Sequence, residues 1–430
     1  MHNNSNIAFQ PATVIQTFQE TKLKELLAYL QQRSPFYQQL FAAGKIDVAA
    51  INSLSDLAML PTTGKEDLQT RNDEFLCVPK SNIIEYTSTS GTIGKPVTIA
   101  LSDHDLDRLA YNEYSSFICA EGSSNDIYQL MLTLDRQFMA GMAYYTGIRK
   151  MGAGIIRVGP GVPSLQWETI ARLQPTAIVA VPSFIVKLMQ YAEQHKIDIN
   201  NTSVKKAICI GENIRHTDFS LNVLGKKITG AWNIDLYSTY ASTEMQTAFT
   251  ECRAQQGGHL QPDLLIVELL DDNDNPVAPG NPGEVTITTL GLEAMPLLRY
   301  KTGDICIAHH EPCSCGRNSL RLSPVIGRKK QMIKYKGTTL FLPALSDILN
   351  DMEDIVDFVV EVYANDLGTD EILLHLVRRH DTPESDHKIR AYLQARLRVS
   401  PHITYITREQ MVQLQFPDGG RKPLKFIDKR

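Results

Sequence analysis

A segment rich in hydroxyl residues and glycine, residues 86–96, has the composition of a phosphate-binding loop. It reads Tyr-Thr-Ser-Thr-Ser-Gly-Thr-Ile-Gly-Lys-Pro and ends with Gly94, Lys95 and Pro96. Glycine lets a backbone approach a phosphate closely, hydroxyls and amides donate hydrogen bonds, and lysine supplies positive charge. Surface turns have similar compositions, so the loop alone leaves both interpretations open.

The spacing within this loop excludes a Walker A motif. That motif has four residues between its glycines, followed by a Lys-Ser or Lys-Thr pair that opens a helix. Here two residues separate Gly91 from Gly94, and Pro96 follows Lys95. Proline favours an extended conformation at the preceding residue, and β-forming segments flank the loop at 82–86 and 97–101. We therefore predict that the loop connects two strands.

The elements that must position this chemistry alternate between strand and helix. Short apolar segments separated by helical patterns predict βαβ units and a parallel sheet buried on both faces. The predicted strands are 127–132, 154–158, 177–181, 206–210 and 233–237. Ligands bind such sheets at the carboxyl ends of the strands. Residues 211–213 and 240–244 follow two of these strands, so we expect both segments at the site.

The flanking regions differ in character. Residues 12–43 have helical periodicity, interrupted at Ser34-Pro35, and the chain becomes β-rich from about residue 264. Beyond residue 330 the order is helix, two strands, helix and strand. The prediction is an α/β fold: a large N-terminal domain of parallel-rich sheets layered with helices plus a β-rich subdomain, and a small α+β C-terminal domain. We place the division at residues 1–329 and 330–430.

The composition is typical of a soluble globular protein. The 430 residues are 43% hydrophobic and 21% charged, with a net charge of −5. This balance does not favour nucleic acid or an anionic membrane as a partner, and no apolar run approaches the ~18 residues of a membrane span. The N-terminal residues lack the pattern of a signal peptide, and seven dispersed cysteines argue against a disulfide framework. We expect a cytoplasmic protein.

Four residues form two candidate halves of a zinc site. Cys313 and Cys315 lie in a turn bounded by proline and glycine, and Cys252 is followed by His259. If the two segments are neighbours in the fold, they would supply a tetrahedral Cys₃His set with no open position, which is typical of structural zinc. Reduced cysteines without a metal are the alternative. The other cysteines are expected to be buried small hydrophobic residues: Cys77, Cys119, Cys209 and Cys306.

Five segments occur in the order found in the adenylate-forming enzymes, which this chain therefore resembles over nearly its whole length. They are Ser88–Pro96, Tyr240–Glu244, Tyr300–Asp304, Gly327–Gly337 and Arg421-Lys422. Within that superfamily, residues 293–304, 311–317 and 427–430 are similar to the phenylacetate–CoA ligases. The resemblance implies an ATP-dependent, AMP-forming acid–CoA ligase. Such an enzyme joins a carboxylate to ATP, releases pyrophosphate, and transfers the acyl group to CoA. The acid implied is phenylacetate or another aryl acid.

The resemblance also implies roles for individual residues. Residues 88–95 would hold the β- and γ-phosphates, Tyr240 would stack on adenine, and residues 211–213 would line the base. Asp304 would accept hydrogen bonds from both ribose hydroxyls, and Arg328 would contact the ribose or the α-phosphate. The implied nucleotide- and CoA-binding residues are Ser88, Thr89, Ser90, Gly91, Thr92, Gly94, Lys95, Gly211, Glu212, Asn213, Tyr240, Ala241, Ser242, Thr243, Asp304, Arg328, Lys334 and Lys336. The implied catalytic residues are Glu244, as the Mg²⁺ ligand, and Lys422.

Some positions depart from the family pattern. Ala241 and Arg421 stand where glycines are usual, and Lys330 occupies a hinge position that is commonly aspartate. With Arg421 in place of glycine, Lys425 is the alternative to Lys422 as the lysine of adenylation. The segment 337–343 is one residue longer than the common form. In the family the small domain rotates about the hinge, which would bring Lys334 and Lys336 near CoA.

The predicted partners are a small carboxylic acid, ATP and CoA, with a homodimer as an option. Aromatic and apolar candidates for the acid pocket are equally well explained by core packing: Phe138, Tyr144, Tyr145, Phe184 and Ile214. Two alternative functions stay open at this point. One is an adenylating enzyme that passes its group to a protein or another cofactor, and the other is a non-catalytic nucleotide-binding protein.

Overall fold

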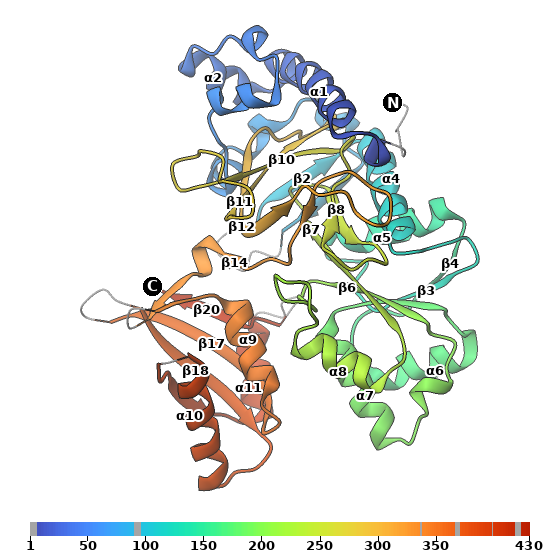
Figure 1. Ribbon diagram of the computed structural model, residues 1–430. Coiled ribbons are helices and arrows are strands. Elements are labelled where there is room, and N and C mark those ends of the chain that lie inside the picture. Colours follow the sequence, from blue (N-terminus) through green and yellow to red (C-terminus); the bar gives the residue numbers. More distant parts are fainter. Residues whose placement is uncertain (1–6, 90–95, 336–337, 366–369, 398, 418–422) are drawn as a thin grey trace. The chain divides into compact units, whose positions relative to one another are not determined.

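The computed structural model describes residues 7–89, 96–335, 338–365, 370–397, 399–417 and 423–430 (Figure 1). The chain divides into two compact units. Unit 1 contains nearly all residues up to Val325, and unit 2 contains Ile326–Arg430. Among the residues that the structure describes, we find no helix that combines the length and the hydropathy of a membrane span.

Unit 1 is built on one mixed sheet with the order β10-β11-β12-β13-β9-β8-β7-β6-β5-β3-β4. Its parallel half consists of β3 (Ile127–Leu130), β4 (Gly154–Arg157), β5 (Ala177–Ala180), β6 (Lys206–Ile210) and β7 (Asp235–Ser242). The other strands in this order are β8 (Thr247–Glu251), β9 (Gly258–His259), β10 (Leu265–Leu270), β11 (Pro282–Thr289), β12 (Tyr300–His309) and β13 (Arg321–Leu322). These pair antiparallel. The predicted class, α/β with a parallel-rich sheet and a β-rich part, is confirmed.

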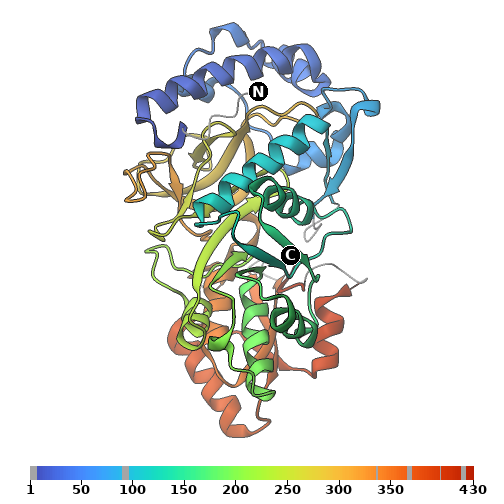
Figure 2. The ribbon, with the colours of Figure 1, turned by 90° about the vertical axis from the view of Figure 1, so that its right-hand side faces the viewer.

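Helices cover both faces of the parallel half, which explains its continuous apolar sequence. On one face Ile178 and Ala180 pack with residues of α6 (Pro163–Leu173), α7 (Pro182–Gln194) and α8 (Val223–Ala231). On the other face Ala177 and Val179 pack with residues of α4 (Asp103–Cys119) and α5 (Met139–Met151). Helices α4 and α5 lie side by side (Figure 2).

The strand–loop–strand prediction is confirmed at the glycine-rich segment. Strands β1 (Glu85–Ser88) and β2 (Thr98–Leu101) pair antiparallel, with Ser88 opposite Thr98. The pairing continues toward the loop, because the Thr89 N–H donates to the Val97 carbonyl at 3.0 Å. The first strand begins three residues later than predicted, since residues 80–82 form the short helix η5 (Lys80–Asn82). The loop residues 90–95 lie outside the described residues.

Strand β7 is longer than predicted. We expected it over 233–237 with residues 240–244 beyond its end, but it runs to Ser242. The extension exists because β8 supplies an antiparallel partner, with Tyr240 opposite Phe249. Tyr240 therefore lies within a strand, and the turn begins at Thr243.

The N-terminal part of unit 1 is helical, as predicted. Helix α1 (Ala12–Arg33) ends at Ser34, which accepts a hydrogen bond from the Tyr37 N–H and caps α2 (Pro35–Gly44). Ser102 caps α4 in the same way through the Asp105 N–H, as Ser and Asp side chains do at helix starts. The shorter helices are η1 (Ile7–Phe9), η2 (Val48–Ala50), η3 (Leu54–Met59), α3 (Lys65–Thr70), η4 (Asn72–Phe75) and η6 (Ile199–Asn201).

Unit 2 has its own sheet and core. Its four-stranded sheet has the order β19-β18-β17-β20, formed by β17 (Ile355–Ala364), β18 (Asp370–Arg378), β19 (His402–Tyr405) and β20 (Phe426–Lys429). The other elements are β14 (Gly327–Arg328), η7 (Lys329–Gln331), β15 (Ile333–Tyr335), β16 (Thr338–Leu340), α9 (Leu342–Asp351), α10 (Pro383–Leu397) and α11 (Arg408–Gln415). Residues of β17, β18, α9 and α10 share one hydrophobic core. The α+β character predicted for this region is confirmed, and α11 was not predicted.

Candidate functional site

Two of the predicted nucleotide-binding residues meet within unit 1. The Tyr240 hydroxyl on β7 donates a 2.7 Å hydrogen bond to Asp304 Oδ2 on β12. Asp304 is only 3% exposed, and the Tyr240 ring packs against Phe249 at a centroid distance of 5.8 Å. Burial and the neighbouring Asp304 charge raise the pKa of Tyr240 well above its usual range. Tyr240 is therefore a protonated donor, and its phenol orients the Asp304 carboxylate.

This contact is possible because the strands between β7 and β12 are very short. In the sheet order β8, β9 and β13 separate them, but β9 and β13 each contain two residues. Side chains near the middle of β12 can therefore reach those of β7. This pairing could not be predicted, because neither two-residue strand has a recognisable sequence pattern.

The turn after β7 carries Glu244, the predicted Mg²⁺ ligand. Ser242 Oγ accepts a hydrogen bond from the Met245 N–H at 3.3 Å, which closes the turn around this residue. Glu244 is half-buried. Burial raises the pKa of Tyr300 above its usual range, and the Glu244 and Asp304 charges raise it further. The Glu244 and Asp304 carboxylates thus both lie near the buried Tyr300 phenol.

The three residues after β6 are held by specific contacts. Gly211 has φ of +74°, a value that favours glycine. The Glu212 carboxylate accepts hydrogen bonds from the Ser183 N–H at 2.8 Å and the Ser183 hydroxyl at 2.9 Å, at the start of α7. The Asn213 amide donates to the Val325 carbonyl at 2.8 Å. The Glu212 side chain therefore stabilises a helix start, which the motif did not predict.

At the glycine-rich loop, the described contacts concern Ser88 and Thr89. The Ser88 N–H donates to the Gln137 carbonyl at 2.9 Å. Gln137 and its neighbour Arg136 both have positive φ, an unusual conformation for residues other than glycine. Sequence reasoning did not single out this segment, although it supports the first strand of the loop. The predictions for Ser90, Gly91, Thr92, Gly94 and Lys95 lie outside the described residues.

The predicted residues of unit 2 are described only in part. Arg328 is exposed at the end of β14, and the Lys334 backbone lies in β15. Lys336 and Lys422 lie outside the described residues. The alternative lysine, Lys425, forms an ion pair with Asp357 and lies 4.6 Å from the Phe358 ring centroid. This ammonium group therefore has a carboxylate partner within unit 2.

The candidates for an acid pocket divide into two groups. Tyr144 and Ile214 are buried in the two cores on opposite faces of the parallel sheet, so packing accounts for both. Phe138, Tyr145 and Phe184 are partly buried at the edges of these cores. These contacts do not define an acid-binding pocket.

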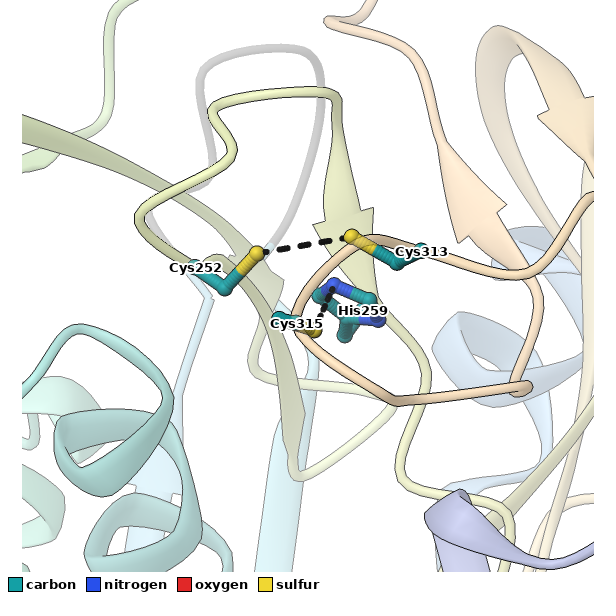
Figure 3. A group of neighbouring side chains, drawn as sticks. All are labelled: Cys252, His259, Cys313 and Cys315. Carbon is teal, nitrogen blue, oxygen red and sulfur yellow. Dashed lines mark hydrogen bonds between the residues drawn. The ribbon is translucent and has the colours of Figure 1, made fainter.

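The four predicted zinc ligands come together in unit 1 (Figure 3). Cys252 follows β8, His259 lies on β9, and Cys313 and Cys315 lie in the turn between β12 and β13. Their ligand atoms all lie within 4.8 Å of one another. Burial, together with the charges of Arg317 and Arg321, lowers the pKa of His259 to about 3, so its imidazole is neutral. The predicted convergence of the two half-sites is confirmed. The other four cysteines are buried, as expected.

Two arginines that the sequence did not indicate surround this cluster. Arg317 Nη1 donates to Cys315 Sγ at 3.5 Å. Arg321 donates to the Gln256 carbonyl and, at 3.1 Å, to the Glu311 carbonyl. Gln256 belongs to the segment between Cys252 and His259, and Glu311 precedes Cys313. Arg321 therefore joins the two segments that carry the cluster.

The fold and the nucleotide-binding motifs define the class of protein. The family model of the AMP-binding enzymes matches residues 6–293, about two thirds of the chain. The chain belongs to this family. Its similarity to solved structures shows the same fold: 2-hydroxyisobutyryl-CoA ligase in complex with R3-HIB-AMP has a TM-score of 0.83 and 19% identity, covering 99% of this chain and 92% of that chain.

Within the family, the chain is similar to phenylacetate–coenzyme A ligases. The enzyme of Thermus thermophilus is 26% identical over 399 residues, covering 89% of this chain and 88% of the relative. The enzyme of Escherichia coli is 26% identical over 347 residues, covering 80% of this chain and 76% of the relative. The chain is thus a phenylacetate–CoA ligase-like, adenylate-forming enzyme, as the motifs predicted.

Proposed function

We propose that this protein is an ATP-dependent, AMP-forming acid–CoA ligase that acts on phenylacetate or another aryl acid. The acid would first form an acyl-adenylate with release of pyrophosphate, and CoA would then take the acyl group with release of AMP. The observation that carries the proposal is the Tyr240–Asp304 contact, which joins two nucleotide-binding motifs in a protein of the AMP-binding family.

The first half-reaction brings two anions together, so it requires cations and hydrogen-bond donors where charge develops. Asp304 would accept the ribose hydroxyls, because each carboxylate oxygen has two lone pairs and Oδ2 can serve both Tyr240 and a ribose hydroxyl. Residues 88–95 would hold the β- and γ-phosphates. Glu244 would ligate Mg²⁺, a hard cation that prefers oxygen ligands.

The second half-reaction would involve both parts of the chain. We propose that residues 1–329 bind ATP and the acid, and that residues 330–430 form a small mobile domain. Lys422 would stabilise the α-phosphate and the attacking carboxylate during adenylation, and Lys334 and Lys336 would lie near CoA in the second step.

A structural Zn²⁺ at the Cys/His cluster would take no part in the chemistry. A cytoplasmic location, where ATP and CoA occur, fits this reaction.

The preference for an aryl acid comes from the similarity to the phenylacetate–CoA ligases. The test is pyrophosphate exchange into ATP across a panel of acids: phenylacetate, benzoate, 2-hydroxyisobutyrate and straight-chain fatty acids. We expect exchange with phenylacetate or a related aryl acid. No exchange with any acid would contradict adenylation, and exchange confined to aliphatic acids would contradict the aryl preference.

The acceptor is tested separately from the acid. With the best acid, ATP and CoA, we expect an acyl-CoA thioester and AMP in equal amounts. An adenylate that accumulates without thioester would instead favour a protein or another cofactor as the acceptor. Pantetheine serves as the matched control, because it offers the same thiol without the nucleotide part of CoA.

A further inference from the structure

We propose that Cys252, His259, Cys313 and Cys315 bind one structural Zn²⁺, and that this ion cross-links the strands that carry the nucleotide site. Thiolates bound to one tetrahedral zinc at about 2.3 Å lie roughly 3.8 Å apart, and a thiolate and an imidazole nitrogen lie roughly 3.6 Å apart. The observed separations are 3.6 Å for Cys252 Sγ to Cys313 Sγ and 3.5 Å for Cys315 Sγ to His259 Nε2. Both distances fit edges of one tetrahedron (Figure 3).

The ligand set selects the metal. Three thiolates and an imidazole in tetrahedral arrangement suit zinc, whereas magnesium and calcium prefer oxygen ligands. All four positions are filled by protein atoms, and three of the four residues are buried. No position is left for water or substrate, so the ion is structural.

The surroundings compensate the charge of such a site. Three thiolates and Zn²⁺ carry a net charge of −1, and the Arg317 guanidinium, which donates to Cys315 Sγ, supplies the opposite charge. The Ala254 N–H donates to Cys252 Sγ at 3.4 Å. Hydrogen bonds to coordinating atoms fix their orientation and tune the metal site. Both donors are already in place.

The two segments are also held together by contacts that do not require the metal. Arg321 donates to carbonyls in both of them, Gln256 and Glu311. Within the second segment the Cys313 N–H donates to the Arg317 carbonyl, and Gly316 takes a φ of +91° that closes the turn. The site is therefore organised before the ion binds, which lowers the entropic cost of binding.

The position of the cluster indicates what the ion does. Cys252 directly follows β8, which pairs with β7 at the position of Tyr240, and Cys313 follows β12, which carries Asp304. In the sheet, β8 and β12 are connected through β9 and β13, which have two residues each. Such short strands form few backbone hydrogen bonds, so the sheet alone holds β8 and β12 together weakly. Zinc bound to both segments would fix the distance between the strands that position Tyr240 and Asp304.

A neighbouring cysteine offers a matched control. Cys119 packs against Cys252 and Cys313, but its thiol donates to the Thr250 carbonyl at 3.3 Å and it is not one of the four clustered ligands. Serine at Cys119 should therefore leave the metal in place, whereas serine at Cys313 or Cys315 should remove it.

The test is the metal content of the full-length protein purified without chelators, by elemental analysis. We expect about one zinc per chain for the wild type and for Cys119→Ser. In Cys315→Ser the zinc content should fall by at least about 80%, because the ion loses one of its four ligands. The proposal is wrong if the folded wild type contains less than about 0.1 zinc per chain. It is also wrong if Cys119→Ser loses as much zinc as Cys315→Ser. A Cys252–Cys313 disulfide found by thiol titration and mass spectrometry would also overturn it.

A second measurement covers the case in which a cysteine variant does not fold. Cobalt replaces zinc in the wild-type protein after chelation, and three thiolate ligands should give an intense thiolate-to-metal charge-transfer band with a tetrahedral visible spectrum. A weak octahedral spectrum would contradict the site. Neither readout depends on the acid or on adenylation, so failure of the zinc proposal is distinguishable from failure of the proposed function.

The cross-linking role has its own readout. Removal of the ion should lower the melting temperature of the wild type and weaken binding of ATP measured by calorimetry, while Cys119→Ser with its zinc should bind ATP like the wild type. Unchanged ATP affinity in chelated, folded protein would limit the ion to a local role and overturn this part of the proposal.

Discussion

The Tyr240 hydroxyl and the Asp304 carboxylate are joined by a 2.7 Å hydrogen bond between residues 64 positions apart in the chain. The two residues come from different motifs, one on β7 and one on β12. Because the carboxylate is buried, this donor helps to fix its orientation. Tyr240 thus acts on Asp304 through its hydroxyl, in addition to the adenine stacking proposed for its ring.

Removing this hydroxyl should weaken ATP binding. For Tyr240→Phe we expect the KM for ATP in pyrophosphate exchange to rise about tenfold. This factor corresponds to the low end of the free energies measured for a hydrogen bond to a charged group. Tyr237→Phe is the matched control, since Tyr237 lies on the same strand and donates to Glu121 Oε2 at the same 2.7 Å distance. If both variants change the KM equally, the effect is one of stability and the positioning role of Tyr240 is wrong.

Sequence patterns predicted the parallel half of the sheet better than its antiparallel half. Segments such as 177–181 are fully apolar because both faces are covered, and such runs are easily recognised. Strand β12 begins Tyr-Lys-Thr-Gly-Asp and was recognised only as a motif, because charged residues and glycine hide its strand character. The two-residue strands β9 and β13 exist only through pairing with distant segments, so local sequence could not reveal them.

The candidate sites show the same division. The spacing of Cys313 and Cys315 indicated a metal half-site, and the structure brings it to Cys252 and His259. The role of Arg321 could not be predicted, because it depends on β13 lying between β9 and β12. Long-range pairing decides which side chains surround a motif, and a single sequence carries little information about it.

The two C-terminal lysines should have separable effects. Lys425→Ala removes the ion pair with Asp357 and the contact with the Phe358 ring, so we expect a lower melting temperature with exchange activity largely retained. Lys422→Ala should reduce exchange by at least about 100-fold, a typical loss when a group that stabilises transition-state charge is removed, without a comparable change in melting. Thioester formation from a supplied adenylate should persist in Lys422→Ala. The reverse pattern would assign adenylation to Lys425.

Loss of the Glu244 carboxylate should alter the metal dependence of adenylation. For Glu244→Gln we expect the Mg²⁺ concentration at half-maximal exchange to rise at least about tenfold. Mutation of a residue that only hydrogen-bonds to a metal ligand already lowers metal affinity by about this factor. Glu25→Gln, which changes an exposed carboxylate on α1, serves as the control. An unchanged Mg²⁺ dependence in Glu244→Gln would exclude this residue as the ligand.

A buried carboxyl group in α4 should make unit 1 less stable as the pH rises from about 4.5 to 8. Glu113 is 4% exposed and packs against Gly147 of α5; the Asn112 amide donates to its Oε1 at 3.1 Å. Burial raises the pKa of Glu113 from 4.5 to about 8, and the Asn112 hydrogen bond offsets only part of this effect. Between pH 4.5 and about 8, Glu113 is protonated in the folded protein and ionised in the unfolded chain. The free energy of unfolding should therefore fall as pH rises from about 4.5 to 8, by up to about 1.4 kcal/mol per pH unit.

Glu113→Gln tests this dependence, because glutamine resembles the protonated carboxyl group and keeps an oxygen for Asn112. Urea unfolding followed by tryptophan fluorescence reports on unit 1, since Trp167 and Trp232 both lie there. Relative to the wild type, Glu113→Gln should be increasingly more stable as pH rises from 5 to 8. The control Glu168→Gln, at an exposed position of α6, should keep the slope of the wild type. If Glu113→Gln also keeps that slope, another group carries the pH dependence, because a carboxyl group that ionises equally in both states contributes no linkage.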